Sequence, residues 1–516
     1  MKKITVSKRL ILSAILLLGG NLLFFFTIWL LSKYDQIQLD QVLFQMKSPA
    51  SGAHKDLLSS AFFRVGVFGV VLTALEIFLY LLLSGRLKNA FKNKKKYLLY
   101  CNGRVCCFFK KIAIPFSAIM LIFSVFFFSI KLRLVGYIGS MVTESDFIKT
   151  NYVDPNTAKL TFPEQKRNLI YIFLESMETT YAEPEAGGLV TQDFIPELSK
   201  LAKENIHFSN DDNLGGAYSF AGTTWTAAGM VAQTSGITVK VPLTADSYGG
   251  EDAFIPGIVS IGEILEKEGY NQTLLLGSDA AFAGRDSYFT SHGNYNIVDI
   301  VSLKEEGRLP EDYLEFWGYE DQKLFAYARE ELTKLAKQDA PFNFTTLTVD
   351  THFPDGYLCP LCGDEYEEQY ANVLSCSSKQ IYSFIEWIKA QNFYKNTTIV
   401  LSGDHLTMDP NFLADIDENY TRTIYNCIIN APIEPVKTTN REFGTYDMLP
   451  TTLAAIGVEI EGDRLGLGTN LFSEEKTLAE KYGYEALAAE LEKKSSFYNE
   501  EFLQMQQNSL FKKSAE

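Results

Sequence analysis

The sequence lacks internal repeats and low-complexity segments, and after Arg133 it has no further apolar run of membrane-spanning length. Any membrane insertion is therefore confined to the first part of the chain. Positive charge is also scarce after this point. Residues 1–133 hold 19 of the 47 lysines and arginines but only 4 of the 63 acidic residues. A remainder this acidic repels nucleic-acid phosphates, which argues against a nucleic-acid partner.

Three apolar runs do occur, at residues 10–31, 61–83 and 112–130. Each has about the 20 residues that a helix needs to cross a bilayer. The first run lacks a small-residue cleavage site before Lys33, so we expect a retained anchor and not a cleaved signal. The sequence therefore predicts a membrane domain over residues 1–133 with three transmembrane helices in the lipid bilayer.

The flanking charges predict the orientation of these helices. Four basic residues precede the first run, and the loop between the second and third runs holds nine lysines and arginines and no acidic residue. Because cytoplasmic flanks are enriched in Lys and Arg, both segments are expected inside. Everything after Arg133 is then extracytoplasmic, in a multi-pass protein of the cell membrane. The basic loop could instead bind nucleic acid, but its juxtamembrane place favours lipid headgroups.

The remaining chain divides into a polar linker over 134–167, a catalytic domain over 168–475 and a helical tail over 476–516. Within the domain, apolar runs alternate with stretches of helical pattern. This pattern is typical of an α/β fold with a largely parallel central sheet and helices on both faces. The predicted strands are 168–174, 273–277, 344–349 and 398–403, and helices are expected to begin near 262 and to cover 322–337 and 368–391.

Polar residues follow each predicted strand, and the carboxyl ends of parallel strands meet at one edge of a sheet. Glu175, Asp404 and His405 are predicted there as ligands of one divalent metal ion. The predominance of oxygen ligands favours Mn2+ or Mg2+ over Zn2+.

Thr223, in AGTTWTAAGMVAQTSG, lies where a helix is expected to start, and we predict it as both nucleophile and metal ligand. The alternative is that Thr223 or Thr224 only caps the helix. Four further residues are predicted to serve the substrate: Arg285 as a fork for phosphate oxygens, His352 as the group that supplies or takes the proton, and Asp279 and His292 as additional contacts.

Four cysteines fall in the outer part: Cys359, Cys362, Cys376 and Cys427. CPLC at 359–362 resembles half a zinc site, but no second CxxC follows it. A disulfide from this pair to Cys376 is the expected arrangement, and redox catalysis lacks its usual sequence context.

From Asn168 to Phe472 the chain resembles the sulfatase-like phosphoglycerol transferases, which include the lipoteichoic acid synthases and the periplasmic phosphoglycerol transferases that modify membrane-derived glucans. Seven segments in order carry the resemblance: NLIYIFLESMETTY, GTTWTAAGMVAQTSGI, GRDSYFTSHGNYNIVD, LTVDTHFPDGY, LSGDHL, TYDMLPTTLAAIG and RLGLGTNLFS.

The resemblance implies an alkaline-phosphatase-like fold and one Mn2+ or Mg2+ held through Glu175, Thr223, Asp404 and His405. It implies transfer of sn-glycerol-1-phosphate from phosphatidylglycerol through a covalent phospho-threonine intermediate. The acceptor would be an envelope polysaccharide, a teichoic acid or a glycolipid. GTTWT resembles the glucan-modifying branch more than the lipoteichoic branch.

Three alternatives remain open from the sequence. A phosphoethanolamine transferase shares the threonine nucleophile, the metal and the membrane anchor. A sulfatase needs Cys or Ser in a CxPxR or SxPxR setting, and Thr223 has neither Cys, Pro nor Arg around it. A catalytically silent binding domain would be favoured by the loss of a ligand, and none of the expected ligands is missing.

Overall fold

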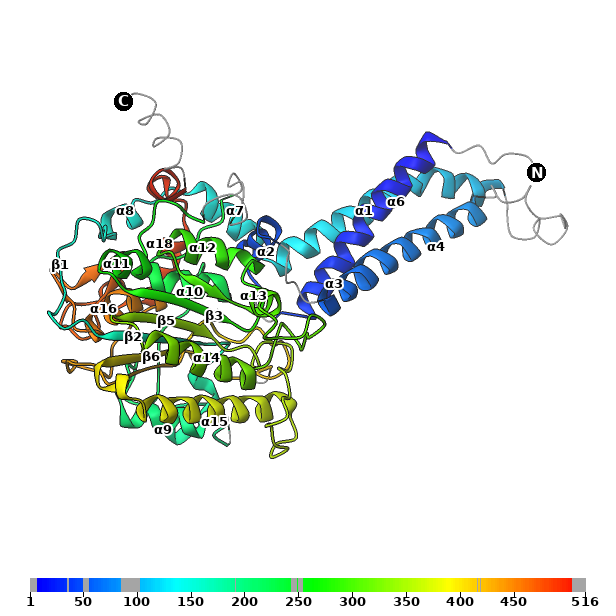
Figure 1. The fold of residues 1–516 in the computed structure, drawn as a ribbon. Helices are drawn as coiled ribbons and strands as arrows, with labels where there is room; N and C mark the ends of the chain where they lie inside the picture. Colours follow the sequence, from blue (N-terminus) through cyan, green and yellow to red (C-terminus); the bar gives the residue numbers. More distant parts are fainter. Residues whose placement is uncertain are drawn as a thin grey trace, which may run out of the picture. The chain divides into compact units, whose positions relative to one another are not determined.

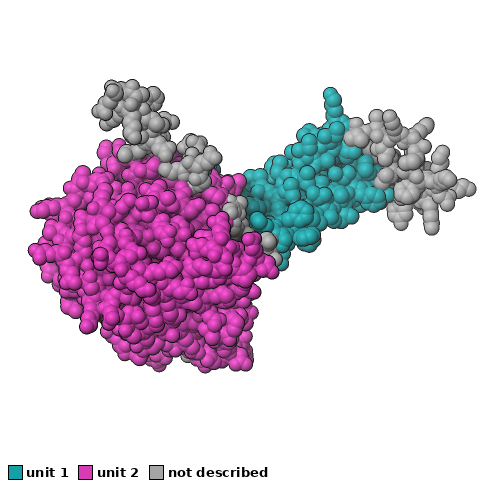
Figure 2. All heavy atoms as spheres, in the orientation of Figure 1, with its two compact units in different colours: residues 1–39, 54–138 teal, residues 40–53, 139–516 magenta. Residues whose placement is uncertain are grey.

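The computed structural model describes residues 7–34, 37–49, 55–84, 103–190, 192–242, 248, 254–414, 416–417 and 419–503. The chain forms two compact units (Figure 2). The first comprises residues 1–39 and 54–138, and the second comprises residues 40–53 and 139–516.

The first unit contains three helices that are long and apolar enough to cross a membrane, Lys8–Leu31, Leu57–Leu83 and Cys106–Lys131. They coincide with the three apolar runs of the sequence. Most of the basic loop that predicts their orientation, residues 85–102, lies outside the described residues. The helices are α1 (Lys8–Leu31), the continuous α3 (Lys55–Ala61), η1 (Phe62–Val67) and α4 (Phe68–Leu83), and α6 (Gly103–Lys131).

The second unit is built on a six-stranded sheet of order β4-β3-β5-β2-β6-β7 (Figure 1). The four predicted strands are all present and pair in parallel, while β4 and the antiparallel edge strand β7 were not predicted. The strands are β2 (Asn168–Leu174), β3 (Asn271–Leu276), β4 (Asn296–Val298), β5 (Phe342–Leu347), β6 (Thr397–Gly403) and β7 (Asn426–Ile429).

Successive side chains of a strand point to opposite faces, so β2 contributes to two separate cores. Leu169, Tyr171 and Phe173 join one core, whereas Ile170, Ile172 and Leu174 join the other. Helices cover both faces, which explains why the strands read as continuous apolar runs. The first core includes α10 (Thr226–Ser235), α11 (Ile261–Lys267) and α16 (Met448–Ala455); the second includes α9 (Pro196–Glu204), α14 (Asp321–Leu335) and α15 (Gln369–Lys389).

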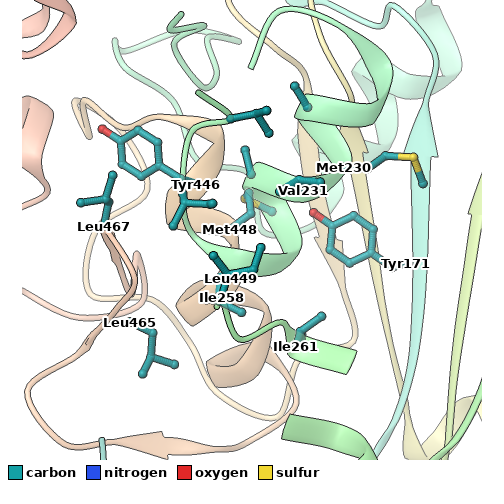
Figure 3. Close-up of a cluster of buried hydrophobic side chains, with 14 of the residues drawn as sticks. Tyr171, Met230, Val231, Ile258, Ile261, Tyr446, Met448, Leu449, Leu465 and Leu467 are labelled. Carbon is teal, nitrogen blue, oxygen red and sulfur yellow. The ribbon is translucent and has the colours of Figure 1, made fainter. Parts of the chain in front are cut away.

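Helix α10 is buried along its length. Figure 3 shows Met230 and Val231 of this helix in one cluster with Tyr171 of β2 and with Met448 and Leu449 of α16. The helix is therefore fixed between the sheet and α16.

Secondary structure extends into the predicted linker and tail. Residues 134–167 contain two helices and a strand, and from Gly139 onward they belong to the second unit. The tail contributes Leu487 and Leu491 to the first core. The additional elements are α2 (Leu39–Lys47), α7 (Leu134–Val142), α8 (Phe147–Asn151), α12 (Arg285–Ser291), α13 (Ile300–Glu305), α17 (Leu478–Tyr482) and α18 (Tyr484–Glu492), and the paired short strands β1 (Leu160–Thr161) with β8 (Glu459–Ile460) and β9 (Arg464–Leu465) with β10 (Gly468–Thr469).

A buried lysine connects this tail to the segment after α10. Lys240 Nζ donates to the backbone carbonyl oxygens of Leu491 and Lys493, at the end of α18. Burial lowers the pKa of Lys240 to about 8. Because the unfolded chain binds this proton more tightly, the stability contributed by Lys240 rises between about pH 8 and its ordinary pKa of 10.5.

We predict that Lys240→Met removes this rise. Between pH 7.5 and pH 10.5 the free energy of unfolding of wild type should rise by about 3 kcal/mol more than that of the variant, since one pKa unit corresponds to about 1.4 kcal/mol. Chemical denaturation of the full chain in detergent at both pH values measures the difference. Lys200→Met is the matched control, because Lys200 is half exposed. Equal pH dependence in the two variants would contradict the assignment.

Candidate metal and nucleophile site

Glu175, Asp404 and His405 meet at the carboxyl ends of two neighbouring strands. β2 and β6 pair in parallel with Leu174 opposite Gly403, so the residues that follow them emerge side by side. One ligand atom from each of the three side chains lies within 4.8 Å of the other two. All three side chains are buried. The structure thus brings together three of the four predicted metal ligands.

The hydrogen bonds of this cluster leave one carboxylate oxygen unsatisfied. Asp404 Oδ1 accepts from the backbone N–H groups of Ser176 and His405, at 2.8 Å each. Asp404 Oδ2 is buried and has no hydrogen-bond partner among the residues that the structure describes. A buried acceptor without a hydrogen-bond partner lowers the stability of the fold by about 1–3 kcal/mol, and a charged acceptor lowers it by more. A divalent cation beside Oδ2 would remove this cost.

His405 is oriented to contribute to the same cation site. Its Nδ1 lies 2.7 Å from the carbonyl oxygen of Leu406, which fixes the proton on Nδ1. The lone pair of Nε2 is then directed toward the carboxylates, 3.5 Å from Glu175 Oε1 and 3.4 Å from Asp404 Oδ2. Two carboxylates and a neutral imidazole fit Mn2+ or Mg2+ and also other divalent ions.

Electrostatics within the cluster also favour a cation. Burial, reinforced by the charge of Glu175, raises the pKa of Asp404 to about 7. Burial opposes a charge on His405, but the Asp404 and Glu175 carboxylates outweigh it and raise the histidine pKa. The cluster therefore retains protons that a bound cation would displace, so metal affinity should fall as the pH is lowered.

The threonine beside this cluster is Thr226 and not Thr223. The Thr226 hydroxyl lies 3.2 Å from His405 Nε2 and 3.3 Å from Glu175 Oε2. The Thr223 hydroxyl is instead bonded to the backbone of Phe220, accepting from its N–H at 3.0 Å and donating to its carbonyl at 2.9 Å. The structure therefore places Thr226, three residues after the predicted Thr223, beside the cluster, and the predicted role of Thr223 as nucleophile and metal ligand stays a prediction.

The physical reason is the start of α10. Trp225 is still extended, with φ −143° and ψ 157°, and the helix begins at Thr226. Thr226 is therefore the residue that lies beside the free backbone N–H groups and the positive end of the helix dipole. The sequence had placed the start of this helix one turn too early.

Two residues of α10 fix its position against β6. Gly229 lies so close to this strand that a Cβ atom there would be 2.1 Å from the carbonyl oxygen of Asp404. Gln233, one turn further on, donates to the carbonyl of Gly403 at 2.8 Å and accepts from the Tyr171 hydroxyl at 2.7 Å. The absence of a side chain at position 229 thus allows Thr226 to reach the cluster.

Arg285 lies near the cluster but is committed to its own loop. Its Nη2 donates to Ser278 Oγ at 3.0 Å and to the carbonyl of Asp279 at 2.7 Å, and its Nε donates to the carbonyl of Phe282 at 3.0 Å. Burial lowers the guanidinium pKa, and the charge of Glu175 opposes this effect. The Asp279 carboxylate accepts from the backbone N–H of Ala281. Both residues shape the loop after β3, and their contact with substrate stays a prediction.

His352 follows β5 and lies within electrostatic reach of His405, Asp404 and Arg285. Burial lowers its pKa to about 3, so the imidazole is neutral. Its Nδ1 lies 2.7 Å from the carbonyl oxygen of Phe353, which leaves Nε2 as an acceptor. The Trp317 ring, at a centroid distance of 4.5 Å, packs against it, a contact that the sequence did not indicate.

His292 does not belong to this site. It is buried between Glu263, whose Oε2 is 3.0 Å from Nδ1, and the carbonyl of Phe254, which is 2.7 Å from Nε2. Both ring nitrogens are used to hold α11 and the end of α12 together. These contacts give His292 a structural role, and its predicted contact with substrate stays a prediction.

A family model for this architecture matches residues 167–458, more than half of the chain, and its description is Sulfatase. The chain belongs to the Sulfatase family. The match spans β2 to α16 and includes Glu175, Thr226, Asp404 and His405, and it confirms the predicted alkaline-phosphatase and sulfatase-like α/β fold.

Curated relatives of this Sulfatase-family chain include phosphoglycerol transferase I of Shigella flexneri, 33% identical over 339 residues, and phosphoglycerol transferase I of Escherichia coli (strain 55989 / EAEC), 32% identical over the same length. Each alignment covers 62% of this chain and 42% of the relative, so the chain matches less than half the length of these proteins. The predicted resemblance to phosphoglycerol transferases is confirmed.

Solved structures similar to the chain include an alkaline phosphatase superfamily protein from Vibrio parahaemolyticus, with 21% identity, a TM-score of 0.49 and coverage of 65% of this chain and 79% of that protein. Another is the lipoteichoic acid synthase LtaP from Listeria monocytogenes, with 18% identity, a TM-score of 0.47 and coverage of 63% and 80%.

We predict that Gly229→Ala disrupts the site. The added methyl group would meet a backbone oxygen that cannot move independently, so α10 must shift away from β6. Overpacking of this kind costs about 1–3 kcal/mol, and the shift should also weaken Mn2+ binding. Thermal unfolding of the full chain in detergent, with and without Mn2+, measures both effects. In the control Gly136→Ala the new Cβ meets nothing within 4 Å; indistinguishable behaviour of the two variants would refute the packing argument.

Proposed function

We propose that this chain is a membrane-anchored phosphoglycerol transferase with Thr226 as its nucleophile. One observation carries the proposal: the Thr226 hydroxyl lies at the start of α10, within 3.3 Å of both His405 and Glu175. The curated relatives that share this part of the chain are phosphoglycerol transferases. A hydroxyl beside a cation site and a helix N-terminus suits phosphoryl transfer, because both stabilise negative charge.

In the first step, Thr226 Oγ1 attacks the phosphorus of phosphatidylglycerol. The new bond forms between this oxygen and phosphorus, while the bond from phosphorus to the diacylglycerol oxygen breaks. Glycerol phosphate is then esterified to Thr226, and the proton that Thr226 loses passes to the departing oxygen, so that diacylglycerol leaves as an alcohol. In the second step an acceptor hydroxyl attacks the same phosphorus, the bond from phosphorus to Thr226 Oγ1 breaks, and the proton of the acceptor hydroxyl returns to Thr226.

One side chain is suited to the proton transfers. Glu175 Oε2 accepts the hydrogen bond of the Thr226 hydroxyl and can receive its proton on attack. His352 is neutral, and its Nε2 is the acceptor nitrogen, so it can accept a hydrogen bond from the acceptor hydroxyl and orient it. A pKa of about 3 makes this imidazole a weak base, so we assign His352 this orienting role, and its predicted part in proton transfer stays a prediction.

Glu175, Asp404 and His405 are the residues that would hold the divalent cation. Bound there, the cation supplies Lewis-acid activation of a hydroxyl and neutralises charge on the phosphate oxygens. Mn2+ or Mg2+ is the proposed ion. Arg285 is proposed to organise the phosphate side of the site through the loop after β3.

A lipid donor is consistent with a chain that carries three apolar helices suited to membrane insertion. We propose that the second unit is extracytoplasmic, where envelope polysaccharides, teichoic acids and glycolipids present acceptor hydroxyls.

The direct test is the intact mass of the full chain in detergent after incubation with phosphatidylglycerol and Mn2+, with peptide mapping of any adduct. Wild type and Thr223→Ala should gain the mass of one phosphoglycerol group at Thr226. Thr226→Ala should gain none and lose about a thousandfold or more in transfer rate, because the variant lacks the hydroxyl that contacts both His405 and Glu175. Melting temperatures of both variants provide the control for folding.

Three outcomes would contradict the proposal in different ways. An adduct on Thr223 would show that Thr223, and not Thr226, is the nucleophile. An adduct formed from phosphatidylethanolamine but not from phosphatidylglycerol would indicate a phosphoethanolamine transferase. Absence of any adduct in folded, metal-bound wild type would favour a binding domain.

A further inference from the structure

Three cysteines outside the catalytic site converge on one point. Cys359 and Cys362 lie in the loop after β5, and Cys376 lies on α15. The Sγ atom of Cys359 is 3.7 Å from that of Cys376 and 3.8 Å from that of Cys362, and all three atoms lie within 4.8 Å of one another. All three are free thiols, so the predicted disulfide to Cys376 is absent from the structure.

The spacing of the sulfur atoms matches a metal–thiolate centre. Zinc binds thiolate sulfur at about 2.3 Å in tetrahedral geometry, which places sulfur ligands about 3.8 Å apart. Two packed thiols can also touch at this distance, so the convergence of three sulfur atoms, and not the spacing of one pair, indicates a metal site. Each of the three has a second sulfur atom as its neighbour here, and Cys359 has two.

The surroundings are those of a built site. Cys359 and Cys376 are buried, each 4% exposed, and Cys362 is half-buried. Gln380, one helical turn after Cys376, donates from Nε2 to the Sγ atoms of Cys376 at 3.4 Å and Cys359 at 3.6 Å. Amide donors to sulfur stabilise thiolate charge and are common partners of metal-bound thiolates.

The loop geometry adds to this. The backbone N–H of Cys362 donates to the carbonyl of Cys359 at 3.0 Å, which closes the tight turn of Cys359-Pro-Leu-Cys362 and directs both sulfur atoms to the same side.

We propose that Cys359, Cys362 and Cys376 bind one Zn2+ ion, separate from the cation at Glu175, Asp404 and His405. Three thiolates select a soft ion over Mn2+ or Mg2+. A cavity of about 250 Å³, lined by Cys376, Gln380 and Leu361 among others, borders the cluster and has room for a water molecule as the fourth ligand. The ion ties the loop that follows His352 to α15, and its role is structural.

The experiment uses the full chain in detergent, reduced and freed of metal with a chelator, and titrated with Co2+. Thiolate ligation gives a sulfur-to-cobalt charge-transfer band in the near ultraviolet and strong visible absorption from tetrahedral cobalt. Wild type should show both, saturating at one ion per chain, and one equivalent of Zn2+ should abolish them. Metal analysis of protein purified with reductant should find one zinc per chain.

The variants locate the ion. Cys376→Ser and Cys359→Ser should lose the charge-transfer band. Cys427→Ser is the matched control, since this buried cysteine lies on β7 outside the cluster, and Asp404→Asn removes the other cation site; both should keep the band. The Co2+ titration of wild type tests the proposal even if one of the variants fails to fold.

Two results would overturn the proposal. One is the absence of the charge-transfer band in fully reduced wild type. The other is a disulfide among the three cysteines, found by peptide mapping in protein that contains no zinc when purified without reductant.

Discussion

The close approach of α10 to the end of β6 is the constraint on which the rest of the site depends. Gly229 permits backbone contact with Asp404, and Gln233 fastens the same helix to Gly403 and Tyr171. As a result the first residue of α10, Thr226, lies beside Glu175 and His405. A side chain at position 229 would separate the hydroxyl from the charged groups that can activate it.

The fold concentrates charge where that helix begins. Parallel strands bring acidic residues together in a buried place, where an isolated carboxylate is costly. Asp404 Oδ2 remains without a hydrogen-bond partner among the described residues, and the Asp404 pKa is raised to about 7. Such a cluster is stabilised by a cation, and the cation and the helix N-terminus together favour a bound phosphate. The cation that stabilises the folded cluster is therefore also the cation that would serve phosphoryl transfer.

Much of this was readable from the sequence, because strands buried on both faces give continuous apolar runs and their ends share one edge of the sheet. Glu175, Asp404 and His405 were found in this way. The short strand β4 and the edge strand β7 were missed because three or four residues carry too little pattern. Thr226 was missed because Thr223, Thr224 and Thr226 are all plausible helix starts, and only the extended backbone of Trp225 decides between them. The contacts of His292 with Glu263 and Phe254 could not be predicted, because these residues are distant from it in the chain.

If Glu175, Asp404 and His405 hold one cation beside Thr226, calorimetric titration of Mn2+ into the metal-free full chain should find one site in wild type and in Thr223→Ala. Asp404→Asn and Glu175→Gln should bind Mn2+ about a hundredfold or more weakly, and binding to wild type at pH 7 should release protons. Equal Mn2+ binding by wild type and Asp404→Asn would show that these side chains do not hold the cation.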